Sequence, residues 1–298
     1  MTQIKLILAS CFLLLSTQLH AEDTTPVSGL KCVFFAALVP HENESPLAGM
    51  HDRLPAIAKK AGVSGHSQTA LTLDPDKDKR AAQIKAALSG ERVDLLALPF
   101  SRTIMGSRTP FIEIMDQALT INPKMQFLIQ IPGPLNIPIR DVKEFRYNSN
   151  RFHKSVFSVI VSRLRERYPS NRISCAFYGQ PATEMKLQFD NKQLTGITAL
   201  VGEQGVFRTK AGQPGPILAD LNAMFTLALI YDVDLAQTDF GFAYEADLAS
   251  IATNVLKHEV EHRPLVLKPS TGDDPNIFTL ENWDRPWAYT VPPTKKKG

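Results

Sequence analysis

The sequence predicts an α/β fold in which a doubly wound parallel sheet lies between two layers of helices, a three-layer α/β/α sandwich. Three observations lead to this prediction. Short β-rich segments alternate with helical patterns along most of the chain. The first strand-like segment, 32–39, is apolar throughout rather than at every second residue, which is typical of a strand covered on both faces. No linker-like stretch divides residues 29–265, so one domain accounts for the alternation.

Five segments are expected to form the sheet. The first, 32–39, is a continuous apolar run, so we expect it to be an interior strand with a neighbour on each side. The other four are short runs rich in aliphatic, aromatic or β-branched residues. They cover 68–73, 93–98, 126–131 and 173–178.

Helical patterns follow these strands. The first covers 46–61 and is expected to end at Gly62, because glycine commonly closes a helix. The others cover 79–88, 109–120, 141–168, 182–189, 217–230 and 246–262. Ligands of such sheets bind outside the carboxyl ends of the strands. The loops expected there are 40–45, 74–78, 99–106 and 132–138, with 204–216 able to join them.

The N-terminus has the features of a secretory signal peptide over residues 1–21. Lys5 precedes an apolar run, 6–15, and Ala21 provides a small residue at the expected cleavage site. The run is too short to cross a bilayer, which takes about 20 apolar residues. A lipoprotein box at Cys11 is an alternative, but the apolar run continues beyond that cysteine. We therefore expect an exported protein, periplasmic or extracellular, without a membrane span.

The sequence predicts three segments along the chain. Residues 1–21 are the signal peptide, 22–265 the α/β domain and 266–298 an extended tail.

The chain of 298 residues carries 33 basic and 30 acidic residues, a net charge of +3, which is too small to suggest nucleic acid as a partner. Cys32 and Cys175 could pair in an exported protein, but both lie in strand-like runs, which favours two separate buried thiols.

Two regions contain residues with catalytic potential. The segment HEVEH, 258–262, matches a zinc motif in which His258 and His262 bind the metal, Glu259 acts as general base and Glu281 is a third ligand. Its alternative is a solvated helix end, because Pro264 stops the helix. The chain contains no dinucleotide fingerprint, phosphate-binding loop or G-x-S-x-G elbow, so no cofactor is expected.

The loop after the first strand is the second such region. It contains His41, Glu42, Glu44 and Ser45, a polar cluster placed where this topology presents a nucleophile or binds a ligand. The alternative is a turn and helix-capping segment, with Ser45 standing directly before Pro46.

Several segments resemble exported SGNH (GDSL-like) hydrolases, in collinear order over about residues 30–265. They are LPAIAKKAG (54–62), KAALSGERVD (85–94), NPKMQ (122–126), GQP (212–214) and the helix that ends at Ile230 and Tyr231. The resemblance implies a flavodoxin-like sheet order and, in the family, ester hydrolysis by Ser, Asp and His. The helix that ends at His262 resembles the last helix of the family, which argues against the zinc motif.

The positions of the family's triad hold other residues in this chain. Glu42 stands at the nucleophile position, Thr209 at the Asp position and Gln213 at the His position. A glutamine side chain has no titrating nitrogen and cannot activate a serine. We therefore expect a degenerate enzyme that binds a glycan, an acyl ester or a partner protein. The alternatives are an active esterase or deacetylase using Ser45 with His41 as base, and the zinc hydrolase.

Overall fold

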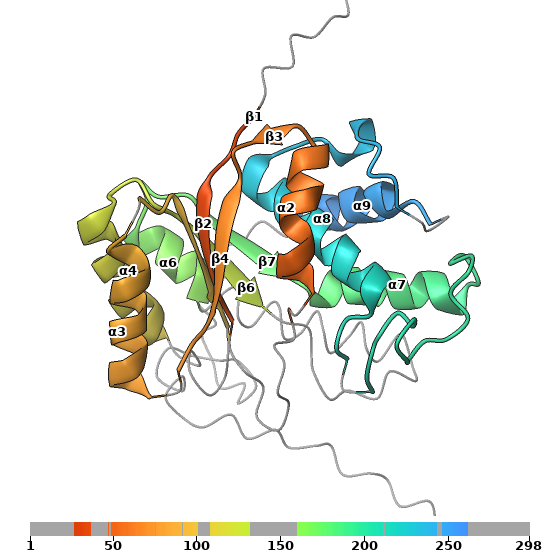
Figure 1. Cartoon of the computed structure of the whole chain (residues 1–298), viewed down its shortest axis with the longest axis horizontal. Helices are drawn as coiled ribbons and strands as arrows, with labels where there is room; N and C mark the ends of the chain where they lie inside the picture. The colour runs from red at the N-terminus through yellow and green to blue at the C-terminus, as the bar shows by residue number, and fades with distance from the viewer. Residues whose placement is uncertain are drawn as a thin grey trace, which may run out of the picture.

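The computed structural model describes residues 27–36, 47, 49–74, 76–90, 92–100, 108–131, 160–210, 212–242 and 246–261. Its centre is a five-stranded sheet in the order β4-β2-β5-β6-β7, with every neighbouring pair parallel (Figure 1). The strands are β2 (Lys31–Ala36), β4 (Ser67–Thr72), β5 (Leu95–Pro99), β6 (Gln126–Ile131) and β7 (Ile173–Phe177). The predicted doubly wound, flavodoxin-like α/β fold is confirmed, and the first strand lies inside the sheet as expected.

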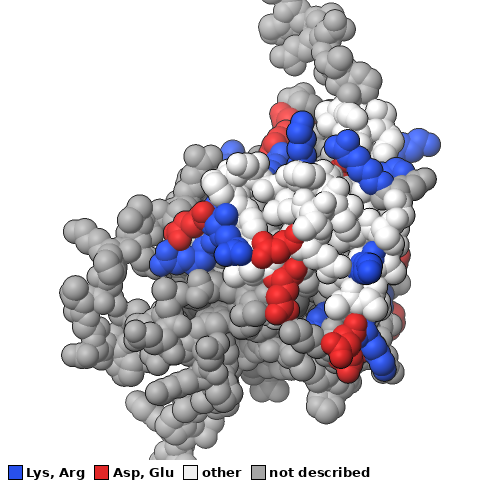
Figure 2. Space-filling view, turned by 90° about the vertical axis from the view of Figure 1, so that its left-hand side faces the viewer, with Lys and Arg blue, Asp and Glu red and all other residues white. Residues whose placement is uncertain are grey.

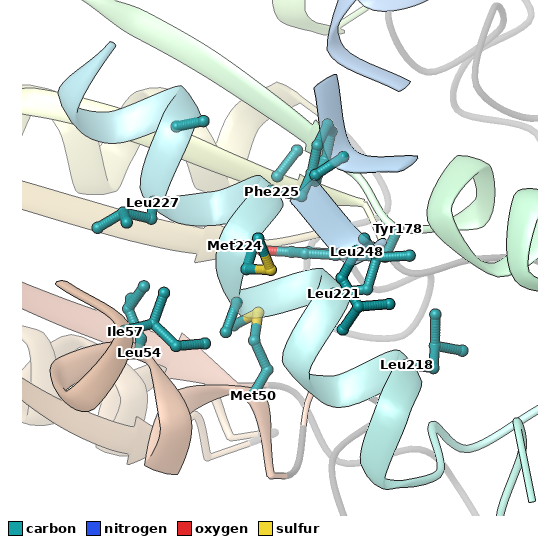
Figure 3. Packing of buried hydrophobic residues seen from close by; sticks show 14 of the residues in the cluster. Met50, Leu54, Ile57, Tyr178, Leu218, Leu221, Met224, Phe225, Leu227 and Leu248 are labelled. Atoms are coloured by element: carbon teal, nitrogen blue, oxygen red, sulfur yellow. The ribbon is translucent and has the colours of Figure 1, made fainter. Parts of the chain in front are cut away.

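Helices cover both faces of the sheet. One face packs against α3 (Lys77–Leu88), α4 (Arg108–Ile121) and α6 (Ser162–Arg167). The other packs against α2 (Met50–Lys60), α7 (Gly179–Asp190), α8 (Pro216–Tyr231) and α9 (Leu248–Glu261) (Figure 1). The last layer is built around α8, whose residues are buried along almost its whole length because α2, α7 and α9 surround it. Figure 3 shows Met50, Leu54 and Ile57 of α2 against Leu221, Met224 and Leu227 of α8.

Local chemistry explains where several helices begin and end. α3 begins two residues before its predicted start because the Asp76 carboxylate accepts the backbone N–H groups of Asp78 and Lys79. α7 follows β7 almost directly, with only Tyr178 between them, so the predicted gap before residue 182 is wrong. α2 ends before Gly62, whose φ of 74° suits glycine.

Other predicted elements are described only in part. Of the predicted helix 141–168, the structure describes Ile160, Val161 and α6; residues 132–159 lie outside the described residues. A small parallel pair, β1 (Val27–Ser28) with β3 (Val63–Ser64), and a 3₁₀ turn, η2 (Leu235–Gln237), were not expected. The proposed signal peptide and the tail 266–298 also lie outside the described residues and remain predictions.

Pro55 lies inside α2 and removes one of its backbone hydrogen bonds. The carbonyl of His51, four residues earlier, has no amide hydrogen to accept from within the helix. The carboxamide of Gln68 on β4 donates to that carbonyl instead. A side chain of the sheet therefore completes the helix that packs on it.

Cys32 and Cys175 are free and buried. They lie on β2 and β7, with β5 and β6 between them, and contribute to opposite faces of the sheet. The helices among the described residues lack the combination of length and apolar character that a membrane crossing requires. The outer side of α3, α4 and α6 carries charges of both signs (Figure 2), with pairs such as Arg163–Glu166 and Arg167–Asp116.

Candidate functional site

The carboxyl edge of the sheet is where the topology places a ligand. Its described parts are the residues that follow β7, the start of α2, and the segment 200–215 that leads into α8. Since Tyr231 at the end of α8 contacts Leu30 just before β2, α8 must begin at the opposite, carboxyl edge. Gly49, directly before α2, lies against Ala219 near the start of α8, so the N-termini of both helices face this edge. Their free N–H groups give the edge a positive partial charge.

The segment before α8 has a defined conformation set by Phe207. This residue bridges both Val201 and Pro214, and its amide donates to the carbonyl of Leu200 at 2.9 Å. Gly215 passes directly over Gly205, where an added Cβ would lie 1.9 Å from the Gly205 carbonyl oxygen. Any side chain at position 215 would therefore force the segment apart. Glycine is required here by close approach and not by an unusual φ.

Thr209 and Gln213, two of the predicted degenerate triad positions, lie on one turn of this segment. The amide of Arg208 donates to the Gln213 carbonyl at 2.8 Å, and that of Gly212 donates to the Thr209 carbonyl at 3.1 Å. The Oγ1 atom of Thr209 is buried and has no hydrogen-bond partner among the described residues. The turn thus carries a hydroxyl side chain and an amide side chain, and neither can act as a general base near neutral pH.

The chain that leaves the first-strand loop lies against the start of α8. Gly49, with a φ of 78°, sits where an added Cβ would be 3.7 Å from the Cβ of Ala219. Arg53 joins the same two elements, since its Nε lies 2.7 Å from Oδ1 of Asp220 and its Nη1 donates to the Gly49 carbonyl at 2.8 Å. The exit of that loop and the segment with Gln213 are therefore both anchored to the first turns of α8.

His41, Glu42, Glu44 and Ser45 lie outside the described residues. Their roles, and any contact between Ser45 and His41, remain predictions.

A chain of buried, uncharged polar groups lies beneath this edge and was not predicted. Gln130 Nε2 donates to Tyr178 Oη at 3.2 Å, and Tyr178 Oη lies 2.9 Å from Thr226 Oγ1. The Thr226 hydroxyl in turn contacts the carbonyl of Asn222 at 2.8 Å. Burial raises the pKa of Tyr178 to about 12, so its phenol keeps its proton at neutral pH.

Two acceptors in this chain remain unused. The side-chain oxygens Oε1 of Gln130 and Oδ1 of Asn222 are buried and find no partner in the part of the chain that the structure describes. A buried acceptor without a donor is unfavourable, so these two oxygens mark a weakly satisfied point in an otherwise bonded chain of polar groups. The signal that the sequence analysis missed was the pair Gln126 and Gln130, which places two amides on one face of an otherwise apolar strand.

His51, near the start of α2, is also buried. Its ring lies 4.9 Å from that of Phe34, and its Nε2 has no partner within the described segments. Burial lowers the pKa of His51 to about 4, against a smaller opposing effect of Asp52, so the ring is neutral at neutral pH. It adds another uncharged polar group to this side of the sheet.

The zinc motif falls mostly beyond the described side chains. His258 and Glu259 belong to α9, as predicted, but their side chains are not described, and His262 and Glu281 lie outside the described residues. Over the side chains that are described, no group of three His, Cys, Asp or Glu residues could hold a metal ion. The zinc hydrolase therefore remains an untested alternative to the degenerate esterase.

Comparisons of the chain with protein-family models, with curated proteins and with solved structures found no match.

Proposed function

We propose that this protein is an exported, SGNH-hydrolase-like binding protein that has lost serine-esterase chemistry and binds a glycan, an acyl ester or a partner protein at the carboxyl edge of its sheet. The observation that carries the proposal is the turn with Thr209 and Gln213. This turn adjoins α8, to which the exit of the first-strand loop is also anchored. In the SGNH family the corresponding residues are the Asp and His that activate the serine.

The chemical argument rests on proton transfer. A serine hydroxyl is a weak nucleophile unless a neighbouring base accepts its proton. The amide of Gln213 and the hydroxyl of Thr209 cannot fill that role. The buried groups beneath this edge, Gln130, Tyr178 and Thr226, are uncharged as well and form hydrogen bonds with one another. They favour a neutral, hydroxyl-bearing ligand over a charged one.

The first experiment tests for the missing chemistry. The mature protein is treated with a fluorophosphonate probe and assayed with short acyl esters and acetylated sugars, beside a Ser45→Ala variant as the matched control. We expect no serine labelling and no turnover above the control, because loss of triad members removes most of the rate enhancement. Labelling or turnover that Ser45→Ala abolishes would establish instead an esterase that uses Ser45, with His41 as the candidate base.

The second experiment tests for binding at the proposed place. Acetylated oligosaccharides are titrated into the protein while the backbone amide signals of Thr209, Gly212 and Gln213 are followed by NMR. Saturable shifts of these signals, weakened in a Gln213→Ala variant, are expected. Shifts confined to residues of the opposite edge, such as Ser64, would contradict the proposed location.

Export is tested separately, by cell fractionation and N-terminal sequencing of the mature chain. The proposal expects a periplasmic or secreted form that begins at Glu22. A full-length form that stays in the cytoplasm would overturn this part of the proposal without affecting the binding site.

A further inference from the structure

The amino edge of the sheet, opposite the proposed ligand site, contains a chain of hydrogen bonds centred on His66. Nδ1 of His66 lies 2.7 Å from Tyr231 Oη, at the end of α8, and Nε2 lies 3.1 Å from Gln68 Oε1. Tyr231 Oη also accepts the backbone N–H of Leu30, directly before β2, at 3.0 Å. The hydroxyl of Tyr231 thus joins the end of α8 to the start of the central strand.

The partners determine the direction of each bond when His66 is neutral. Oε1 of Gln68 is an acceptor, so Nε2 of His66 carries the hydrogen and Nδ1 is left as an acceptor. The hydroxyl of Tyr231 therefore donates to Nδ1 and accepts from Leu30. The carboxamide N–H of Gln68 donates to the His51 carbonyl, so each of these five groups has a matching partner.

A proton added to His66 reverses one of these bonds. Nδ1 becomes a donor, so the hydroxyl of Tyr231 must turn its hydrogen away and accept from the ring instead. A phenolic oxygen has two favoured hydrogen-bonding directions in the plane of its ring, and its own hydrogen occupies one of them. His66 and the Leu30 amide then compete for the remaining position. The bond from Nε2 to Gln68 is unaffected, because that nitrogen is a donor in both states.

We propose that His66, Tyr231 and the Leu30 amide form a proton-sensitive latch, which holds the start of β2 to the end of α8 while His66 is neutral and releases the Leu30 amide when His66 takes up a proton. Burial lowers the pKa of His66 below its ordinary value of 6.5, opposed in part by the Gln68 bond. The closed latch is therefore the state at neutral pH, and mild acid opens it.

Other titratable groups around the latch come from each neighbouring element. Cys32 of β2 contacts Tyr231, and its thiol donates to the Leu30 carbonyl with a separation of 3.7 Å. Asp94, ahead of β5, accepts the Lys31 amide at 3.1 Å, and its charge acts on both Cys32 and Tyr231. Asp232, next to Tyr231, pairs with Arg172 at 2.9 Å. α2 contributes the His51 carbonyl through Gln68.

Burial raises the pKa values of Cys32 and Tyr231, to about 12 for Cys32. Neither group changes charge between pH 5 and 8, which leaves His66 as the switching group of the latch.

The experiment measures hydrogen-exchange protection of the Leu30 amide by NMR in the wild-type protein and in His66→Asn. Asparagine places an oxygen acceptor near the position of Nδ1 and does not titrate. On acidification from about pH 7.5 to about pH 5, the Leu30 protection factor should fall about tenfold in the wild type and stay constant in the variant. The Phe127 amide, bonded to the Arg172 carbonyl, is the internal reference. A wild-type value that does not fall, or an equal fall in both proteins, would overturn the proposal.

A second measurement does not depend on the variant. The ring nitrogens of His66 in the wild type should show the Nε2–H tautomer at about pH 7.5. A hydrogen on Nδ1 at that pH would mean that Tyr231 accepts from the ring already, and the latch would not exist.

Discussion

The two faces of the central sheet differ in chemistry although both are buried. The face toward α3, α4 and α6 carries large apolar side chains: Val33, Phe35, Leu96, Leu98, Phe127, Ile129, Ile131, Ile173, Cys175 and Phe177. The face toward α2, α7 and α8 also carries Phe34, Leu95 and Leu128, but mixed with smaller or polar strand residues: Cys32, Ala97, Gln130 and Ala176. The first face contributes mainly packing energy. The second gives up some of it for hydrogen bonds that lead to the proposed ligand edge.

β6 offers the clearest test of this difference, because its neighbouring residues point to opposite faces. Phe127→Ala removes a fully buried ring from the apolar face. We expect the free energy of unfolding to fall by about 3–5 kcal/mol, through lost burial and the cavity left behind. Urea unfolding followed by circular dichroism measures it, with Phe127→Leu as the milder control. A loss below about 1 kcal/mol would show that this face can collapse around the gap.

The polar face should make stability depend on pH through His51. Its pKa is lowered in the folded protein from 6.5 to about 4, so the unfolded chain binds the proton first as the pH falls. The stability that comes from keeping His51 neutral is fully present above about pH 6.5. As the pH falls to about 4, the free energy of unfolding should decrease progressively by about 3 kcal/mol. Urea unfolding across this range measures it. A His51→Leu variant should show a correspondingly flatter profile, although His66 still contributes.

The helix that covers this face depends on Gln68 because of Pro55. Gln68→Leu should lower the free energy of unfolding by about 1 kcal/mol, because it leaves the His51 carbonyl without its donor. In a Pro55→Ala background the alanine amide can restore the helical bond, so the same substitution should cost less. The double-mutant cycle measures this coupling. Equal costs in both backgrounds would show that Gln68 acts only through its bond to His66.

The smallest effect is expected at Gln130, on the polar face of β6. Gln130→Met removes a buried amide whose oxygen has no partner among the described residues, while Tyr178 keeps its contact with Thr226. The free energy of unfolding should change by less than about 1 kcal/mol, because methionine fills a similar volume. A loss above about 2 kcal/mol would mean that the amide is essential for packing. Unchanged stability with weaker oligosaccharide binding would sharpen the distinction between the faces.

Periodicity in the sequence was sufficient for the strands but not for their two faces. The segment 126–131 was predicted with its observed bounds, since its residues are β-prone and it follows a turn at Asn122 and Pro123. The near-continuous apolar character of such segments identifies interior strands and hides which residues face which helices. Gln130 was therefore overlooked, although its position in the alternation was readable. The start of α7 was missed because Gly179 and Pro181 normally signal a turn.

The sequence by itself determined the fold class, the interior place of the first strand and the identity of the residues at the proposed triad positions, because each of these depends on local pattern or on residue type. Only the tertiary structure decided which polar groups meet. His66 and Tyr231 are 165 residues apart and Tyr178 and Thr226 are 48 apart, yet each pair forms a hydrogen bond. Such contacts depend on how α8 packs across the sheet. That packing results from the burial of many side chains at once, which no local pattern encodes.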